Sequence, residues 1–66
     1  MINNLKGIRE AKGMTQAELE NKSGISRQTI SAIENGKTND VKSGTLVALA
    51  EALETTLDAI FFDKAV

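Results

Sequence analysis

The stretch SRQTISAIENGKT, residues 26–38, carries side chains that could make hydrogen bonds to a partner outside the chain. At about 100° per residue of an α-helix, Ile30 and Ile33 fall on one side and pin the segment to a core. The opposite side carries short, polar and nearly uncharged residues, namely Gln28, Ser31, Ala32 and Asn35. A solvated helix face would more often carry Glu and Lys, so the composition of this face indicates a surface that could bind a partner.

Arg27, at the first turn of this segment, and Gln28 next to it have side chains suited to reading base edges in DNA. Arg can bond guanine with two parallel hydrogen bonds, Gln can do the same with adenine, and Ala can pack on the methyl group of thymine. The small Ser31 and Ala32 would let the helix approach the floor of a groove closely. The N-terminus of the helix, with unpaired N–H groups, suits a phosphate. On this spacing alone an ordinary solvated face fits equally well.

Composition restricts the classes of function. The 66 residues allow a single domain, 1–66, and contain no Cys, His, Trp, Tyr or Pro. Without His or Cys the usual catalytic bases, nucleophiles and zinc ligands are missing, so we expect neither an enzyme nor a metal or other cofactor. A chain of this length buries only about 60% of its unfolded surface, which makes help from a partner subunit plausible.

Net charge is −1, but its distribution is uneven. Residues 1–42 hold seven Lys or Arg against five acidic residues, whereas residues 43–66 hold one Lys against four. A local basic face acts within a Debye length of about 10 Å, so the total charge neither proves nor excludes DNA binding. No window approaches the roughly 18 apolar residues of a membrane span, and no apolar signal segment is present, so we expect a cytoplasmic protein without a membrane partner.

Apolar spacing and turn residues predict five short helices and an all-α fold. A first helix over residues 4–12 ends at Gly13, and a capping box of Thr15 and Glu18 opens a second near residue 16. The second stops at Ser23-Gly24, and Ser26 caps a third that ends at Asn35-Gly36.

The polar loop 37–44 then leads to a fourth helix, whose apolar stripe is Leu46, Leu49, Ala50 and Leu53. A possible capping box of Thr55 and Asp58 opens a short fifth helix through Phe61. Residues 62–66 fit either a frayed end or a short strand. The second and third helices, joined by a short glycine-containing turn over about residues 15–35, have the helix-turn-helix arrangement.

The segment MTQAELENKSGISRQTISAIENGKTN closely resembles the lambda-repressor-like, Cro-type helix-turn-helix family, also called XRE-type regulators. The match includes the Thr-Gln-Ala-Glu-Leu opening, the Ser-Gly-Ile-Ser turn, the Ile-Ser-x-Ile-Glu-Asn-Gly-Lys close and the later Leu-x-x-Leu-Ala-x-Ala-Leu. It runs from about residue 5 to residue 61. The resemblance implies a compact five-helix DNA-binding domain whose third helix enters the major groove of double-stranded DNA.

The resemblance also assigns roles to single residues. It implies that base edges are read by Arg27, Gln28 and Ala32, with Ser31 nearby. It implies phosphate contacts from Gln16, Ser26, Asn35, Lys37 and Thr38. Three of these phosphate residues also have a simpler structural role: Ser26 is a helix cap, Gln16 a first-turn residue, and Asn35 a C-terminal cap.

Departures from the family pattern concern Glu20 and the loop after the third helix. Glu20 stands where the family usually has a small Ala, so we expect it at the edge of the core with its stem packed, paired with Lys22 or Arg27. The loop Asn39-Asp40-Val41-Lys42 lacks a frequent proline and is about one residue longer, and Gly44 stands where Ser is common. These changes concern the phosphate contacts of the loop and leave the expected fold unchanged.

Arg9 and Glu34 are expected to form an ion pair that supports this framework. Each lies four residues from a core position, Arg9 from Leu5 and Glu34 from Ile30, at the flank of the buried face. Two long opposite charges at the edges of one core are best explained by each other, and the family resemblance also places them as a pair.

The C-terminal segment 57–66 is expected to join two copies of the chain. Adjacent Phe61 and Phe62 diverge by about 100° on a helix and cannot both face the core. The predicted dimer interface is therefore Leu57, Ile60, Phe61, Phe62 and Val66. Alternatively, one exposed Phe is common enough to need no cause.

We therefore expect a homodimeric, sequence-specific DNA-binding transcriptional regulator, acting as a repressor on an inverted-repeat operator. The alternative is the antitoxin of a toxin–antitoxin pair, which would bind the same kind of site and also a toxin protein. A protein-interaction module that has lost DNA binding is a third class, and the retained Gln16, Arg27, Gln28 and Lys37 argue against it.

Overall fold

Five helices form the described part of the computed structural model, which comprises residues 3–38 and 41–60. They are α1 (Leu5–Ala11), α2 (Gln16–Ser23), α3 (Arg27–Glu34), α4 (Ser43–Ala52) and α5 (Leu57–Ile60). No strand occurs within these residues. The all-α class and the number of helices agree with the prediction from apolar spacing.

Helices α2 and α3 begin where their capping residues predict. The Thr15 hydroxyl accepts from the Glu18 N–H at 3.0 Å, and the Glu18 carboxylate accepts from the Thr15 N–H at 2.8 Å, which completes the capping box. The Ser26 hydroxyl accepts from the Thr29 N–H at the start of α3. Between them Gly24 takes a φ of 76°, a left-handed conformation that lets the chain turn sharply.

Predicted boundaries at three helices were wrong by one or two residues. The first helix spans Leu5–Ala11 and not residues 4–12. The loop before α4 ends at Lys42, so Ser43 and Gly44 belong to the helix. At α5 the capping hydroxyl is that of Thr56, which accepts from the Ala59 N–H at 3.1 Å, and not that of Thr55.

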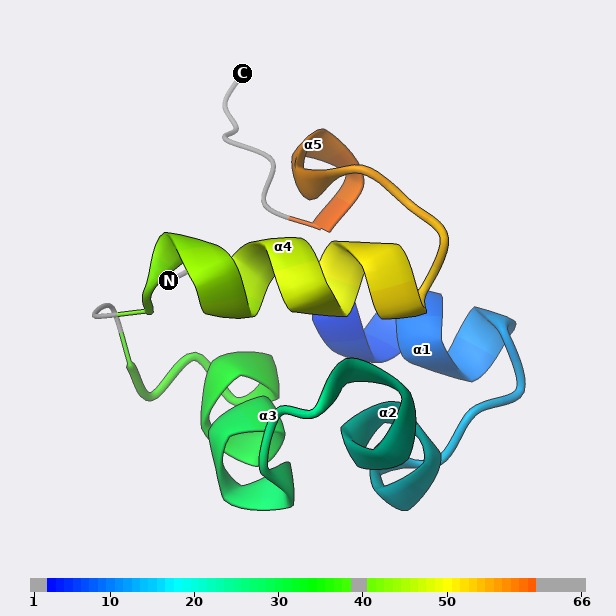
Figure 1. Cartoon of the computed structure of the whole chain (residues 1–66), viewed down its shortest axis with the longest axis horizontal. Helices are drawn as coiled ribbons and strands as arrows, with labels where there is room; N and C mark the ends of the chain where they lie inside the picture. The colour runs from blue at the N-terminus through cyan, green and yellow to red at the C-terminus, as the bar shows by residue number, and fades with distance from the viewer. Residues whose placement is uncertain (1–2, 39–40, 61–66) are drawn as a thin grey trace.

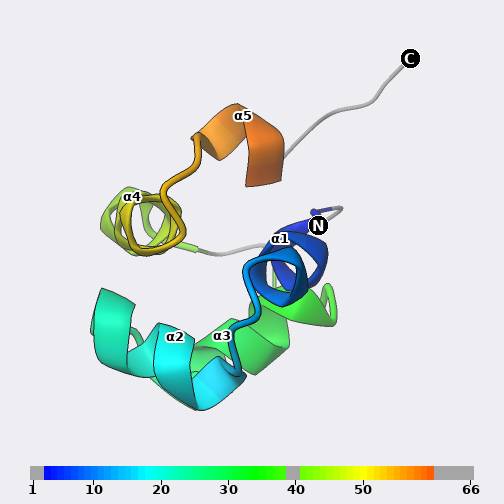
Figure 2. The same ribbon diagram turned by 90° about the vertical axis from the view of Figure 1, so that its right-hand side faces the viewer.

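A single hydrophobic core includes buried residues from all five helices. Its buried members are Leu5, Leu19, Ile30, Ile33, Leu49, Ala50, Leu53 and Ile60. Helix α4 lies between α5 on one side and the α2–α3 pair on the other, as both views show (Figure 1, Figure 2). The α2–α3 pair therefore occupies one end of the molecule and α5 the opposite end.

No helix in the described ranges is both long and apolar enough to cross a bilayer.

Candidate nucleic-acid interface

Helix α3 presents two long polar side chains, those of Arg27 and Gln28, that bind no other residue in the described part of the chain. Its inner positions Ile30 and Ile33 are completely buried, which fixes the rotation of the helix about its axis. Arg27 and Gln28 consequently lie on the exposed side of the first turn. Within residues 3–38 and 41–60 neither side chain makes a hydrogen bond or an ion pair.

Gln28 and Ala32 line a groove together with the segment that enters α4. The same groove is lined by Thr29, Thr38, Val41, Lys42 and Thr45. Thr38, expected to contact a phosphate, thus lies beside two residues expected to read bases. Lys42 adds a positive charge that the site prediction did not include.

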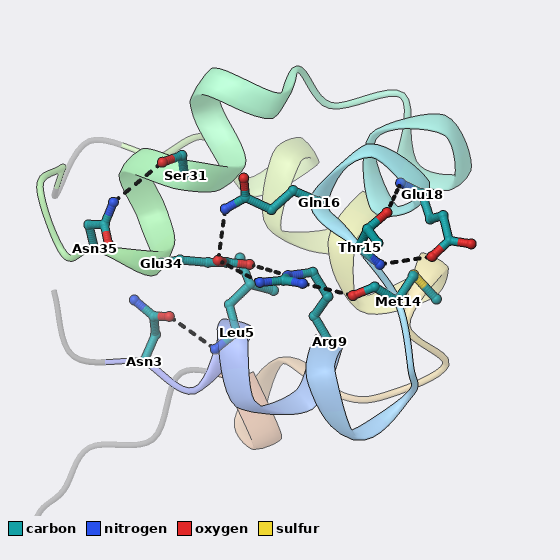
Figure 3. Close-up of polar contacts among 10 residues, drawn as sticks. All are labelled: Asn3, Leu5, Arg9, Met14, Thr15, Gln16, Glu18, Ser31, Glu34 and Asn35. Atoms are coloured by element: carbon teal, nitrogen blue, oxygen red, sulfur yellow. Dashed lines mark hydrogen bonds and ion pairs between the residues drawn. The ribbon is translucent and has the colours of Figure 1, made fainter.

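Ser31 and Asn35, one turn apart on α3, are bonded to each other. The Asn35 side-chain amide donates to the Ser31 hydroxyl at 3.3 Å (Figure 3). Asn35 is also the C-terminal cap of α3, and the exposed Lys37 closes the helix by donating its backbone N–H to the Ala32 carbonyl at 2.9 Å. The Lys37 ammonium makes no ion pair within the described residues and is available to a phosphate.

Ser26 uses its hydroxyl within the chain. It donates to the Thr29 hydroxyl at 2.9 Å and accepts from the Thr29 N–H at 3.2 Å. Any phosphate held by Ser26 in this conformation would therefore be bound by its backbone N–H rather than by its hydroxyl proton.

Gln16, the first residue of α2, is half-buried and its amide donates to Glu34 Oε1 at 3.0 Å. Figure 3 shows this amide beside the paired charges of Arg9 and Glu34. An amide nitrogen carries two hydrogens, so one N–H remains for a phosphate. The bond to Glu34 restricts where that second N–H can point.

Arg9 and Glu34 form an ion pair at the edge of the core. Arg9 Nε donates to Glu34 Oε2 at 2.7 Å, and Arg9 Nη2 donates to Oε1 at 3.2 Å. A third donor, Nη1, bonds the Met14 carbonyl at 2.7 Å, which fixes the turn before α2. The hydrogen bond to Glu34 raises the pKa of Arg9 above its ordinary value, against the lowering caused by burial.

Glu20 has a role that the sequence reasoning missed. It is half-buried, and its Oε2 accepts from the backbone N–H of Arg27, the first residue of α3, at 3.1 Å. The prediction of an ion pair with Lys22 or Arg27 was wrong, because among the described residues only Arg9 and Glu34 form one. The sequence did offer a signal for this bond. Glu20 stands where the family usually has a small Ala, beside a short turn, so its carboxylate can reach the unpaired N–H groups at the start of the next helix.

The residues expected at a dimer interface divide into three groups. Leu57 is 39% exposed, whereas Ile60 is fully buried in the core of its own chain and offers no surface. Phe61, Phe62 and Val66 lie outside the described residues. Val47 on α4 is the other exposed large apolar side chain in the described part, at 42%.

Comparison with known proteins places this geometry in a family context. Residues 5–60 match the model of a family described as Helix-turn-helix. Over 58 residues the chain is 38% identical to the HTH-type transcriptional repressor RghR of Bacillus subtilis, covering 88% of this chain and 43% of that relative. Over 50 residues it is 44% identical to the HTH-type transcriptional regulator y4dJ of Sinorhizobium fredii, covering 76% and 64%.

The chain spans less than two thirds of the length of either relative. The family match and the names of the relatives indicate a helix-turn-helix domain of the kind found in regulators of transcription.

Proposed function

This chain belongs to the Cro-type helix-turn-helix family, and from that premise we propose that it is a sequence-specific transcriptional regulator that binds an inverted-repeat operator as a homodimer. It acts in the cytoplasm, where a bacterial or phage operator would be found. Occupation of promoter DNA blocks transcription, so repression is the simplest mechanism. The name of the Bacillus subtilis relative, a transcriptional repressor, supports this direction of control.

The observation that carries the proposal is the exposed first turn of α3. Arg27 and Gln28 face outward without partners in the described chain, on a helix held rigidly by Ile30 and Ile33. A recognition helix of this family inserts its N-terminal residues into the major groove. In that position Arg27 pairs with guanine and Gln28 with adenine, while Ala32 packs against a thymine methyl group.

Phosphate contacts set the register of the helix in the groove. We assign them to the second amide N–H of Gln16, the backbone N–H of Ser26, Asn35, Thr38 and the Lys37 ammonium. Lys42 joins this set, because it lines the same groove as Gln28 and Ala32. These contacts supply affinity for any duplex, and the α3 side chains supply the preference.

Dimerisation through the C-terminal segment fits the arrangement of the helices. Helix α5 lies at the end of the molecule opposite α2 and α3 (Figure 2). A two-fold contact that covers Leu57 leaves both recognition helices uncovered. The dimer then reads two half-sites, and therefore twice as many base pairs as one recognition helix contacts alone.

Selection of binding sites from a random pool of duplexes, using the purified chain, tests this function. We expect enrichment of a two-fold symmetric sequence with guanine and adenine contacts in each half-site. Failure to enrich any sequence, with a protein that circular dichroism shows to be helical and folded, would overturn sequence-specific binding.

A further inference from the structure

Glu20 places a negative charge at the N-terminus of α3. Its Oε2 accepts the Arg27 N–H at 3.1 Å, while Ser26 accepts the Thr29 N–H at 3.2 Å. Two of the N–H groups that a helix leaves unpaired at its start are therefore bonded within the chain. Such a helix end carries about half a positive charge and normally attracts anions. Here the anion is already supplied by α2.

No basic side chain neutralises this carboxylate within the described residues. The ion pair of Arg9 and Glu34 is the only one they contain, so neither Lys22 nor Arg27 lies within ion-pair distance of Glu20. The second carboxylate oxygen, Oε1, has no hydrogen-bond partner there either. No cation in the described ranges lies within ion-pair distance to offset the negative charge of Glu20, which therefore repels other anions that approach this helix end.

The same helix end carries Arg27 and Gln28, the residues that enter the groove under the proposed function, on which this inference rests. DNA phosphates flank the groove and come close to the entering helix end. The Debye length is about 8 to 10 Å in ordinary buffers, so a carboxylate at this position is not screened from the nearest phosphates.

We propose that Glu20 limits phosphate binding by α3: its carboxylate occupies the Arg27 N–H at the N-terminus of the helix and thereby keeps a DNA phosphate from binding that N–H. Binding to DNA of arbitrary sequence depends on phosphate contacts. By removing one such contact and adding a repulsion, Glu20 lowers the affinity for DNA of any sequence, including DNA that α3 does not recognise. The charge, and not only the hydrogen bond, is what produces this effect.

Glu20→Gln separates the charge from the hydrogen bond, because the amide oxygen can still accept the Arg27 N–H. Glu51→Gln is the matched control: it removes one negative charge from an exposed position in the last turn of α4. Binding of wild type and both variants is measured by fluorescence anisotropy, on the selected operator and on a duplex of scrambled sequence, over a salt series. Thermal unfolding of each protein is followed by circular dichroism.

We expect E20Q to bind the scrambled duplex about three- to tenfold more tightly than wild type at about 50 mM salt, with a steeper salt dependence. E51Q should change this affinity less than about twofold, and both variants should unfold at nearly the wild-type temperature. An E20Q affinity within about twofold of wild type, or an equal gain in E51Q, would overturn the inference. If the folded wild type shows no preference for any operator, sequence-specific binding fails. A threefold or greater gain confined to E20Q would still support the phosphate exclusion in that case.

Discussion

Arg9 and Glu34 join the first helix to the third through two parallel hydrogen bonds, of 2.7 and 3.2 Å, at the edge of the core. Their side chains are 9% and 2% exposed, so water can solvate neither charge well if its partner is lost. Gln16 and the Met14 carbonyl complete the network and tie the start of α2 to the same pair (Figure 3). The pair thus holds three helices in the orientation that α3 requires.

A double-mutant cycle tests how the pair contributes to stability. Removing one member strands the other as a buried charge, which costs about 3 kcal/mol of unfolding free energy, whereas the pair itself adds little net stability. We expect Arg9→Met or Glu34→Gln alone to destabilise the chain more than the double substitution does. Urea unfolding of the four proteins measures the coupling. A double-variant loss equal to the sum of the single losses would contradict it.

Base readout predicts sequence-dependent losses at the first turn of α3. Arg27→Ala or Gln28→Ala should each cost about 1 to 3 kcal/mol of binding free energy on the operator, because one bidentate contact is lost. Each should also relax the preference at one base pair. Binding is measured against operators substituted at single positions. Equal losses on operator and scrambled DNA would rule out base contact by these residues.

Lys37→Ala should behave differently from those two variants. Lys37 is exposed and lies at the far end of α3 from Arg27 and Gln28. A contact to a phosphate does not depend on which bases the DNA carries. We expect weaker binding to every duplex and a salt slope reduced by about one unit. A loss restricted to the operator would assign Lys37 to a base instead.

Local patterns predicted the helix ends that depend on neighbouring residues. The capping box of Thr15 and Glu18, the Ser26 cap and the left-handed glycines at 13, 24 and 36 all lie within one turn of what they terminate. Helix α4 ends differently: Glu54, a non-glycine residue, adopts φ 54° at the corresponding place. The Thr55 N–H donates to the Ala50 carbonyl at 2.9 Å at this helix end. No residue type in the local sequence predicts this conformation.

Contacts between helices were harder to predict than helix ends. The bond of Gln16 to Glu34 spans 18 residues, and that of Glu20 to the Arg27 N–H spans a turn whose exact path decides whether the carboxylate reaches. Side-chain type and spacing do not specify these distances. The pairing of Arg9 with Glu34 could be predicted because two long opposite charges flank positions that must be buried, and because the family resemblance also places them as a pair.

Gly24 and Gly44 provide a matched pair for testing backbone conformation. A Cβ at either position would meet no atom within 4 Å, so packing does not distinguish them. Gly24 has φ 76°, where a Cβ costs about 1 kcal/mol, whereas Gly44 is helical and gains about 0.5 kcal/mol on substitution by Ala. We expect Gly24→Ala to lower and Gly44→Ala to raise the midpoint of thermal unfolding. Shifts of the same sign would contradict this backbone argument.

The assembly of two chains is tested at the C-terminal segment. Leu57 is the exposed large apolar residue of α5, and a charge placed there should prevent a contact that buries it. Sedimentation equilibrium at micromolar concentration should show a dimer for wild type and a monomer for Leu57→Glu. Phe62→Glu is expected to act in the same way. Val47→Glu is the matched control, because Val47 is similarly exposed, at 42%, but lies on α4, outside the expected interface.

Operator binding should follow the state of association in these variants. A dimer places two recognition helices about one DNA turn apart, roughly 34 Å, so both half-sites are occupied in one event. A monomer must bind each half-site separately and loses the benefit of the linked second contact. We therefore expect Leu57→Glu to weaken binding to the complete inverted repeat far more than binding to a single half-site. A wild-type chain that sediments as a monomer, with operator affinity unchanged by Leu57→Glu, would exclude a dimer through this segment.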